Sequence, residues 1–104
     1  MKTPLDALVG LSVTKVIKIK GYVQLHFGDE VGLTIYNKIS TVPLTVDVEE
    51  LVGDMVMSVR ASKDLIEIRF LRGPHLKVSM RPEAYQGPEA MELNRKGLPA
   101  IIWN

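Results

Sequence analysis

The fold of this chain is decided by residues 8–36, LVGLSVTKVIKIKGYVQLHFGDEVGLTIY, and by residues 51–79, LVGDMVMSVRASKDLIEIRFLRGPHLKVS, which align at a constant offset of 43 without a gap. Eight of the 29 aligned pairs are identical, whereas composition alone would give roughly two. Three more pairs keep an aliphatic side chain in both copies: Val23/Ile66, Leu25/Ile68 and Ile35/Val78. The pattern predicts one supersecondary unit used twice, with each copy covering the apolar face of the other.

Each copy begins with the signals of a short helix. Asp47 and Glu50 have the spacing of a capping box, and Thr3 offers an N-cap before a proline at the first helical position. Gly10 and Gly53 follow at the point where a residue in the left-handed conformation would end the turn. We expect each helix to be only a turn or two long.

Three strand-like runs follow each glycine. They cover residues 11–20, 22–27 and 31–36 in the first copy and residues 54–63, 65–71 and 75–80 in the second. A change of phase near Lys15, and the same spacing from Val56 to Val59, predicts a bulge in each copy. Alternation turns two sets of side chains outward: Tyr22, Gln24, His26, Thr34 and Tyr36 in the first copy, and Leu65, Glu67, Arg69, Lys77 and Ser79 in the second.

The remaining segments are a connection over residues 37–46 and a tail over residues 81–104. Within the tail, residues 90–93 and 100–103 are candidates for short ordered elements, and the second of these is expected to add a strand or to plug the sheet. The outward side of the second copy is apolar, with Met55, Met57, Leu65 and Leu71. A patch of that kind requires a cover. We expect the tail to provide it, with a partner or dimer contact as the alternative.

The predicted fold class is mainly β. It is an antiparallel, pseudo-two-fold repeat of two three-stranded meanders that forms a half-open barrel or a curved sheet, with short helices. Closure would remove exposed strand edges, but the sequence does not distinguish an open barrel from a closed one. The length of 104 residues suits one modest core, so we expect a single domain over residues 1–104.

Charge and composition exclude several classes of function. The chain has 13 basic and 12 acidic side chains, so no global field attracts a nucleic acid or an anionic membrane. Cysteine is absent, which removes disulfides, thiol nucleophiles and the usual zinc frameworks. Residues 1–10 do not show the charged-then-apolar pattern expected of a leader peptide, and no apolar run approaches the roughly 20 residues needed to span a bilayer. We therefore expect a soluble cytoplasmic protein, with a monomer favoured, that binds no membrane and for which a nucleic-acid partner is not favoured.

The titratable residues do not indicate catalysis. His26 and His75 have no neighbouring nucleophile or carboxylate in the sequence, so both are interpreted as surface histidines, although folding could bring His26 close to Asp29 or Tyr36. The acidic groups at residues 29–30 and 47–54 are explained by turn and helix-cap roles. We therefore expect no enzyme, no metal and no cofactor.

Two alternatives remain beside a protein-binding function. Lys15, Lys18 and Lys20 form a basic run next to Tyr22, which would suit a nucleic-acid-binding β module. A small-molecule-binding β-barrel is the second alternative, and it would require a deep polar cavity.

Several motifs together resemble a known group of proteins. They are the paired Leu-Val-Gly starts, each followed by a Val-x-x-Val strand, a Val/Ile-x-Leu/Ile-x-Phe strand and a Leu-x-Ile/Val strand, then Gly87-Pro88-Glu89-Ala90 and a terminal Ile-Ile-Trp. The chain is similar to small bacterial β-rich proteins that are often immunity proteins of polymorphic toxin and contact-dependent growth inhibition systems. The resemblance implies a cytoplasmic antitoxin that binds one cognate toxin domain, commonly a nuclease and with a ribonuclease favoured, and blocks its active site or substrate path.

The contact set expected for such a protein lies in the first copy. It consists of Tyr22, His26, Asp29, Glu30 and Tyr36. Tyrosines suit the centre of an interface, and acidic side chains would steer the encounter with a basic nuclease. A second candidate patch consists of Asp47, Glu49 and Glu50.

Overall fold

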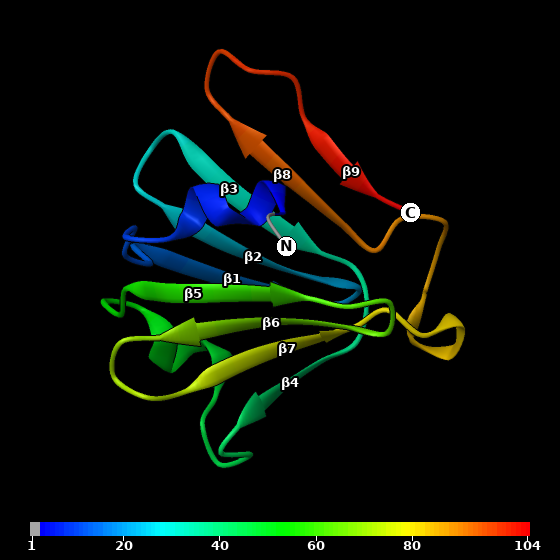
Figure 1. Cartoon of the computed structure of the whole chain (residues 1–104), viewed down its shortest axis with the longest axis horizontal. Helices are drawn as coiled ribbons and strands as arrows, with labels where there is room; N and C mark the ends of the chain where they lie inside the picture. Colours follow the sequence, from blue (N-terminus) through cyan, green and yellow to red (C-terminus); the bar gives the residue numbers. More distant parts are fainter. Residues whose placement is uncertain (1–2) are drawn as a thin grey trace.

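The computed structural model describes residues 3–104, and this part of the chain forms two antiparallel sheets with three short 3₁₀ helices (Figure 1). The five-stranded sheet has the order β1 (Lys15–Ile19), β2 (Tyr22–Phe27), β3 (Val31–Ile35), β8 (Met91–Arg95) and β9 (Ile101–Trp103). The four-stranded sheet has the order β4 (Ile39–Val42), β7 (His75–Ser79), β6 (Leu65–Phe70) and β5 (Val56–Ala61). The helices are η1 (Pro4–Leu8), η2 (Val48–Leu51) and η3 (Pro82–Ala84). The prediction of a mainly β, antiparallel fold is confirmed.

The predicted helix signals act as expected. Thr3 caps η1 and Asp47 caps η2, each through a complete capping box. Gly10 has a φ of 88° and Gly53 a φ of 89°, a conformation that costs a residue with a side chain roughly 1–2 kcal/mol. Both glycines therefore permit the chain to leave the helix and enter the first strand of its sheet.

The strand pairs of the two sheets have the same register at the offset of 43. Val23 pairs with Ile35 across β2 and β3, and Ile66 pairs with Val78 across β6 and β7. The predicted bulge in the second copy is confirmed, because the pairing of β5 shifts between Val56 and Ser58. The bulge predicted near Lys15 is not found, because β1 pairs with β2 without a register shift from Lys15 to Ile19.

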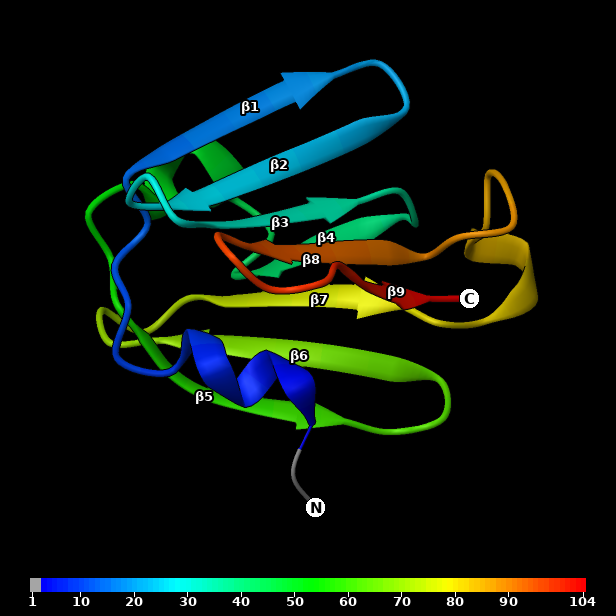
Figure 2. The same ribbon diagram turned by 90° about the horizontal axis from the view of Figure 1, so that it is seen from above.

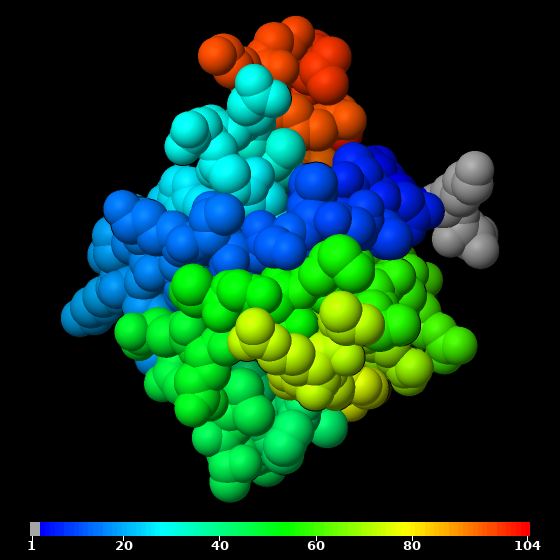
Figure 3. Space-filling model, turned by 90° about the vertical axis from the view of Figure 1, so that its left-hand side faces the viewer, coloured from blue at the N-terminus to red at the C-terminus, as the bar shows by residue number. Residues whose placement is uncertain are grey.

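The two halves of the chain meet at the starts of β1 and β5. Ser12 forms an isolated bridge with Met55. The Gly10 N–H donates to the Val56 carbonyl and the Gly53 N–H to the Val13 carbonyl, at 2.9 and 2.7 Å. Figure 3 shows these segments, in blue and green, packed side by side across one end of the molecule. This contact leaves β9 and β4 at opposite edges (Figure 1), and the two sheets do not close into a barrel.

The strand that follows each meander crosses to the other sheet. β4 comes after β3 in the sequence but pairs with β7, and β8 comes after β7 but pairs with β3 (Figures 1 and 2). The helices cross as well, because η1 contacts β5 and η2 contacts β1. Each half of the chain thus contributes structure to both sheets.

The core lies between the inner faces of the sheets. The inward side chains of the middle strands are buried in both copies, among them Leu25, Leu33, Ile68 and Leu76 at 0% exposure. Burying an aliphatic side chain of this size stabilises the fold by roughly 1.5–3 kcal/mol relative to exposure. The alternation in the sequence therefore predicts the correct inward face in both copies.

The tail forms strands but does not cover the apolar outward side of the second copy. The ordered segments predicted at residues 90–93 and 100–103 correspond to β8 and β9, which extend the five-stranded sheet next to β3. Met57 and Leu71 remain 53% and 57% exposed. The predicted cover is therefore wrong, because β8 pairs with β3 in the five-stranded sheet instead of lying across the other sheet.

Candidate protein-binding face

The outward side chains of the first copy gather on the outer face of the five-stranded sheet. Cross-strand pairing aligns Gln24 with Thr34, and the Gln24 side chain donates to the Thr34 hydroxyl at 3.2 Å. Exposed apolar side chains border this face, with Ile19 at 51% and Ile102 at 47% exposure. The face therefore combines a polar centre with apolar margins.

Tyr22 and Tyr36 lie together at one end of this face. Tyr22 begins β2 and Tyr36 follows β3, and their rings meet edge to face with centroids 6.2 Å apart and an interplanar angle of 62°. The Tyr36 carbonyl accepts a hydrogen bond from the Gln86 side chain at 2.8 Å. Burial raises the pKa of Tyr36, and the nearby Glu92 and Glu89 carboxylates raise it further. The pair is thus a fixed aromatic surface in an acidic environment.

His26, Asp29 and Glu30 lie together at the other end of this face, around a hollow of about 340 Å³. Gly32 lines the hollow from β3, and an added Cβ would meet only the Leu25 carbonyl oxygen at 4.0 Å. His26 and Asp29 border the same space, but no hydrogen bond joins them. Within residues 3–104, Asp29 and Glu30 form no ion pair. Their charges are therefore available to an outside group.

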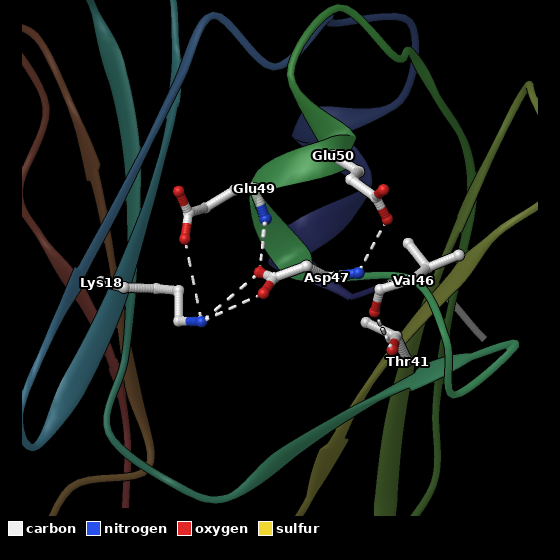
Figure 4. Close-up of polar contacts among 6 residues, drawn as sticks. All are labelled: Lys18, Thr41, Val46, Asp47, Glu49 and Glu50. Atoms are coloured by element: carbon white, nitrogen blue, oxygen red, sulfur yellow. Dashed lines mark hydrogen bonds and ion pairs between the residues drawn. The ribbon is translucent and has the colours of Figure 1, made fainter.

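The second predicted patch is engaged in contacts within the fold (Figure 4). Asp47 accepts a hydrogen bond from the Glu49 N–H at 3.1 Å, and Glu50 accepts one from the Asp47 N–H at 2.8 Å. Lys18 from β1 lies 3.4 Å from Asp47 and 3.8 Å from Glu49. The backbone hydrogen bond from Glu49, and then the Lys18 ammonium, lower the pKa of Asp47. These carboxylates stabilise η2 and its contact with β1.

The basic run in β1 does not form one surface. Lys15 pairs with His26 and faces outward, whereas Lys18 pairs with Val23 and points to the opposite side, toward η2. Residues three apart in a strand always lie on opposite faces. The lysines predicted to act together are therefore separated by the sheet.

An unpredicted charge cluster lies on the outer face of the four-stranded sheet. The Glu67 carboxylate is 3.1 Å from His75 Nδ1 and 3.3 Å from Arg69 Nε. Burial alone would raise the pKa of Glu67, but the hydrogen bonds from His75 and Arg69 lower it overall. The sequence shows no sign of a carboxylate beside His75, and the register of β6 and β7 brings Glu67 to it. The contact between Glu67 and His75 follows from the pairing register of β6 and β7, and the sequence does not specify that register.

Residues 3–104 contain no group of three or more histidine, cysteine, aspartate or glutamate side chains arranged to hold a metal ion. No helix in the same residues combines the length and the apolar character needed to cross a membrane.

Comparison of the chain with protein-family models, with curated proteins and with solved structures finds no match.

Proposed function

We propose that this protein is an immunity protein that binds a cognate toxin domain, a nuclease and preferably a ribonuclease, and blocks its active site. The observation that carries the proposal is the outer face of the five-stranded sheet, where the Tyr22–Tyr36 pair lies at one end and the unpaired Asp29 and Glu30 at the other. An inhibitor of this kind needs a rigid body and a complementary face, and it needs no chemistry of its own.

Rigidity is supported by the packing beneath this face. Leu25 and Leu33 lie on the inner side of the same strands at 0% exposure, so the outward residues are attached to well-packed backbone. A surface that is fixed before binding loses little conformational entropy in the complex. The tyrosine rings would supply contact area, and the carboxylates would orient a basic active-site cleft.

We also propose that the two meanders are related by a pseudo-two-fold axis through the Ser12–Met55 bridge. The equal registers at an offset of 43 and the reciprocal hydrogen bonds of Gly10 and Gly53 support this relation. The outward residues differ between the halves, which supports a binding role for one face only. In this proposal the other face is not needed for toxin binding.

The test is co-expression with the domain encoded by the gene immediately upstream, which this proposal requires to be the toxin. The expected result is that growth is restored, that RNA cleavage stops and that the two proteins co-purify as a complex. A double variant with Tyr22→Ala and Tyr36→Ala should lose protection. The control is Leu65→Ala, which should retain protection, because Leu65 is the counterpart of Tyr22 in the other sheet, 43 positions later in the sequence. Failure of the unmodified protein to bind or protect would overturn the proposal.

A further inference from the structure

We infer that the hollow beside Tyr36 is a binding site for a guanidinium group, contributed by an arginine side chain of the protein partner. The inference rests on the proposed function for the identity of that partner, and on the hollow itself for its chemistry. The hollow has a volume of about 480 Å³ and is lined by Gly21, Tyr36, Gln86, Gly87, Pro88 and Glu89. A volume in this range is typical of ligand pockets.

Three separate segments build this hollow at one end of the molecule. Gly21 belongs to the turn between β1 and β2, Tyr36 follows β3, and residues 86–89 lead from η3 toward β8. Figures 1 and 2 place these segments at the same end of the two sheets. The Gln86 side chain and the Ala90 carbonyl both hydrogen bond to the backbone of Tyr36. These bonds hold the wall of residues 86–89 against the aromatic residue.

The aromatic wall suits a planar cation. Tyr36 lines the hollow, and its ring meets that of Tyr22 edge to face at an interplanar angle of 62°. A guanidinium group is attracted to the face of such a ring and stacks on it. Pro88 adds an apolar surface on which the arginine methylene groups can pack.

The charges around the hollow favour a cation over an anion or a neutral group. Glu89 lines the hollow, and Glu92 in β8 adds, after burial, to the raised pKa of Tyr36. Both glutamates are partly buried, and neither forms an ion pair within residues 3–104. No lysine or arginine of the described chain lines the hollow. An arginine side chain would therefore supply the opposite charge that these carboxylates lack.

This chemistry differs from that of the hollow at His26. The lining of that hollow includes Arg95 and Lys96 as well as Asp29 and Glu30, so side chains of both charges border it. The lining of the Tyr36 hollow carries one sign of charge next to an aromatic face. The two hollows therefore predict different contacts on the same partner.

The test uses two short peptides that differ only in charge. We expect acetyl-Gly-Arg-Gly-amide to shift the backbone amide resonances of Gly21, Tyr36 and Gly87 saturably in an NMR titration. The matched peptide with citrulline, which has the same shape without the charge, should bind at least about fivefold more weakly. Equal binding of both peptides, or shifts confined to η2 and its carboxylates, would overturn the inference.

Variants of the protein complete the experiment. Glu89→Gln combined with Glu92→Gln should weaken binding of the arginine peptide to the level of the citrulline peptide. Tyr36→Leu should also abolish the preference for arginine, whereas Tyr36→Phe should keep it. Glu83→Gln, at an exposed glutamate of η3 that does not line the hollow, should leave it unchanged. If the double glutamine variant binds as the unmodified protein does, the site is not electrostatic and the inference fails.

The two proposals fail in distinguishable ways. Peptide binding at Tyr36 without protection against the toxin would leave the guanidinium site and remove the immunity function. Protection without any preference for the arginine peptide would leave the function and remove this site.

Discussion

The rings of Tyr22 and Tyr36 meet edge to face on the outer surface of the five-stranded sheet, with centroids 6.2 Å apart. The antiparallel register of β2 and β3 produces this contact, because it places the start of one strand beside the end of the next. Two aromatic rings that already support each other lose little side-chain entropy when a partner covers them. The pair is therefore suited to be the centre of a protein interface.

We expect Tyr22→Ala and Tyr36→Ala each to weaken toxin binding by about tenfold or more, because aromatic residues at the centre of an interface carry much of the binding free energy. Isothermal titration calorimetry on the purified complex measures the dissociation constant. Leu65→Ala, on the other sheet, is the control and should leave the constant unchanged. Equal dissociation constants for all three variants and the unmodified protein would contradict the assignment of this face.

Asp54 provides a prediction about stability. It is 2% exposed, and its Oδ1 accepts hydrogen bonds from the Met55 and Arg72 N–H groups at 3.0 and 3.1 Å. Asp54→Ala leaves both donors without this partner, so the free energy of unfolding should fall by about 1–3 kcal/mol. Urea denaturation followed by circular dichroism gives this value. Asp64→Ala, at an exposed aspartate, should change it by less than about 0.5 kcal/mol.

Glu67 predicts a pH dependence of stability. Its pKa lies below the ordinary value of 4.5 in the folded protein. Its ionised form therefore stabilises the fold above the unfolded pKa, and this contribution disappears as the pH falls through the lower folded pKa. The free energy of unfolding of Glu67→Gln should fall less steeply than that of the unmodified protein between about pH 5 and pH 3. Chemical denaturation at several pH values tests this, and parallel curves would refute it.

Gly10 and Gly53 should be less tolerant of substitution than Gly32. Both have φ near +90°, so Gly10→Ala and Gly53→Ala should each lower the free energy of unfolding by about 1–2 kcal/mol. Gly32→Ala meets no close atom and should leave stability unchanged or raise it, because alanine restricts the unfolded chain. Thermal and urea denaturation of the three variants measure the difference. A Gly32→Ala variant as unstable as the other two would show that conformation is not the cause.

Local signals predicted the elements that depend on neighbouring residues. The middle strand of the first copy was expected at residues 22–27, and β2 has these bounds. The sequence also predicted the capping boxes of η1 and η2, because each involves two residues three positions apart. Of the expected contact residues, the structure places Tyr22 beside Tyr36 and gathers His26, Asp29 and Glu30 around one hollow. It ties Asp47, Glu49 and Glu50 to η2 and to Lys18.

The sequence by itself determined the strands of the two meanders, which of their side chains face the core and where each meander turns, because periodicity and turn chemistry act over a few residues. It did not predict β4 (Ile39–Val42), which lies in the segment expected to be a connection. Only the tertiary structure decided that β4 pairs with β7 and that β8 pairs with β3. It also decided that Glu67 meets His75 and that residues 86–89 form a wall beside Tyr36. These pairings depend on which strand edge offers unpaired backbone groups once the core has formed. Distant segments compete for that edge, so no short stretch of the sequence predicts the outcome.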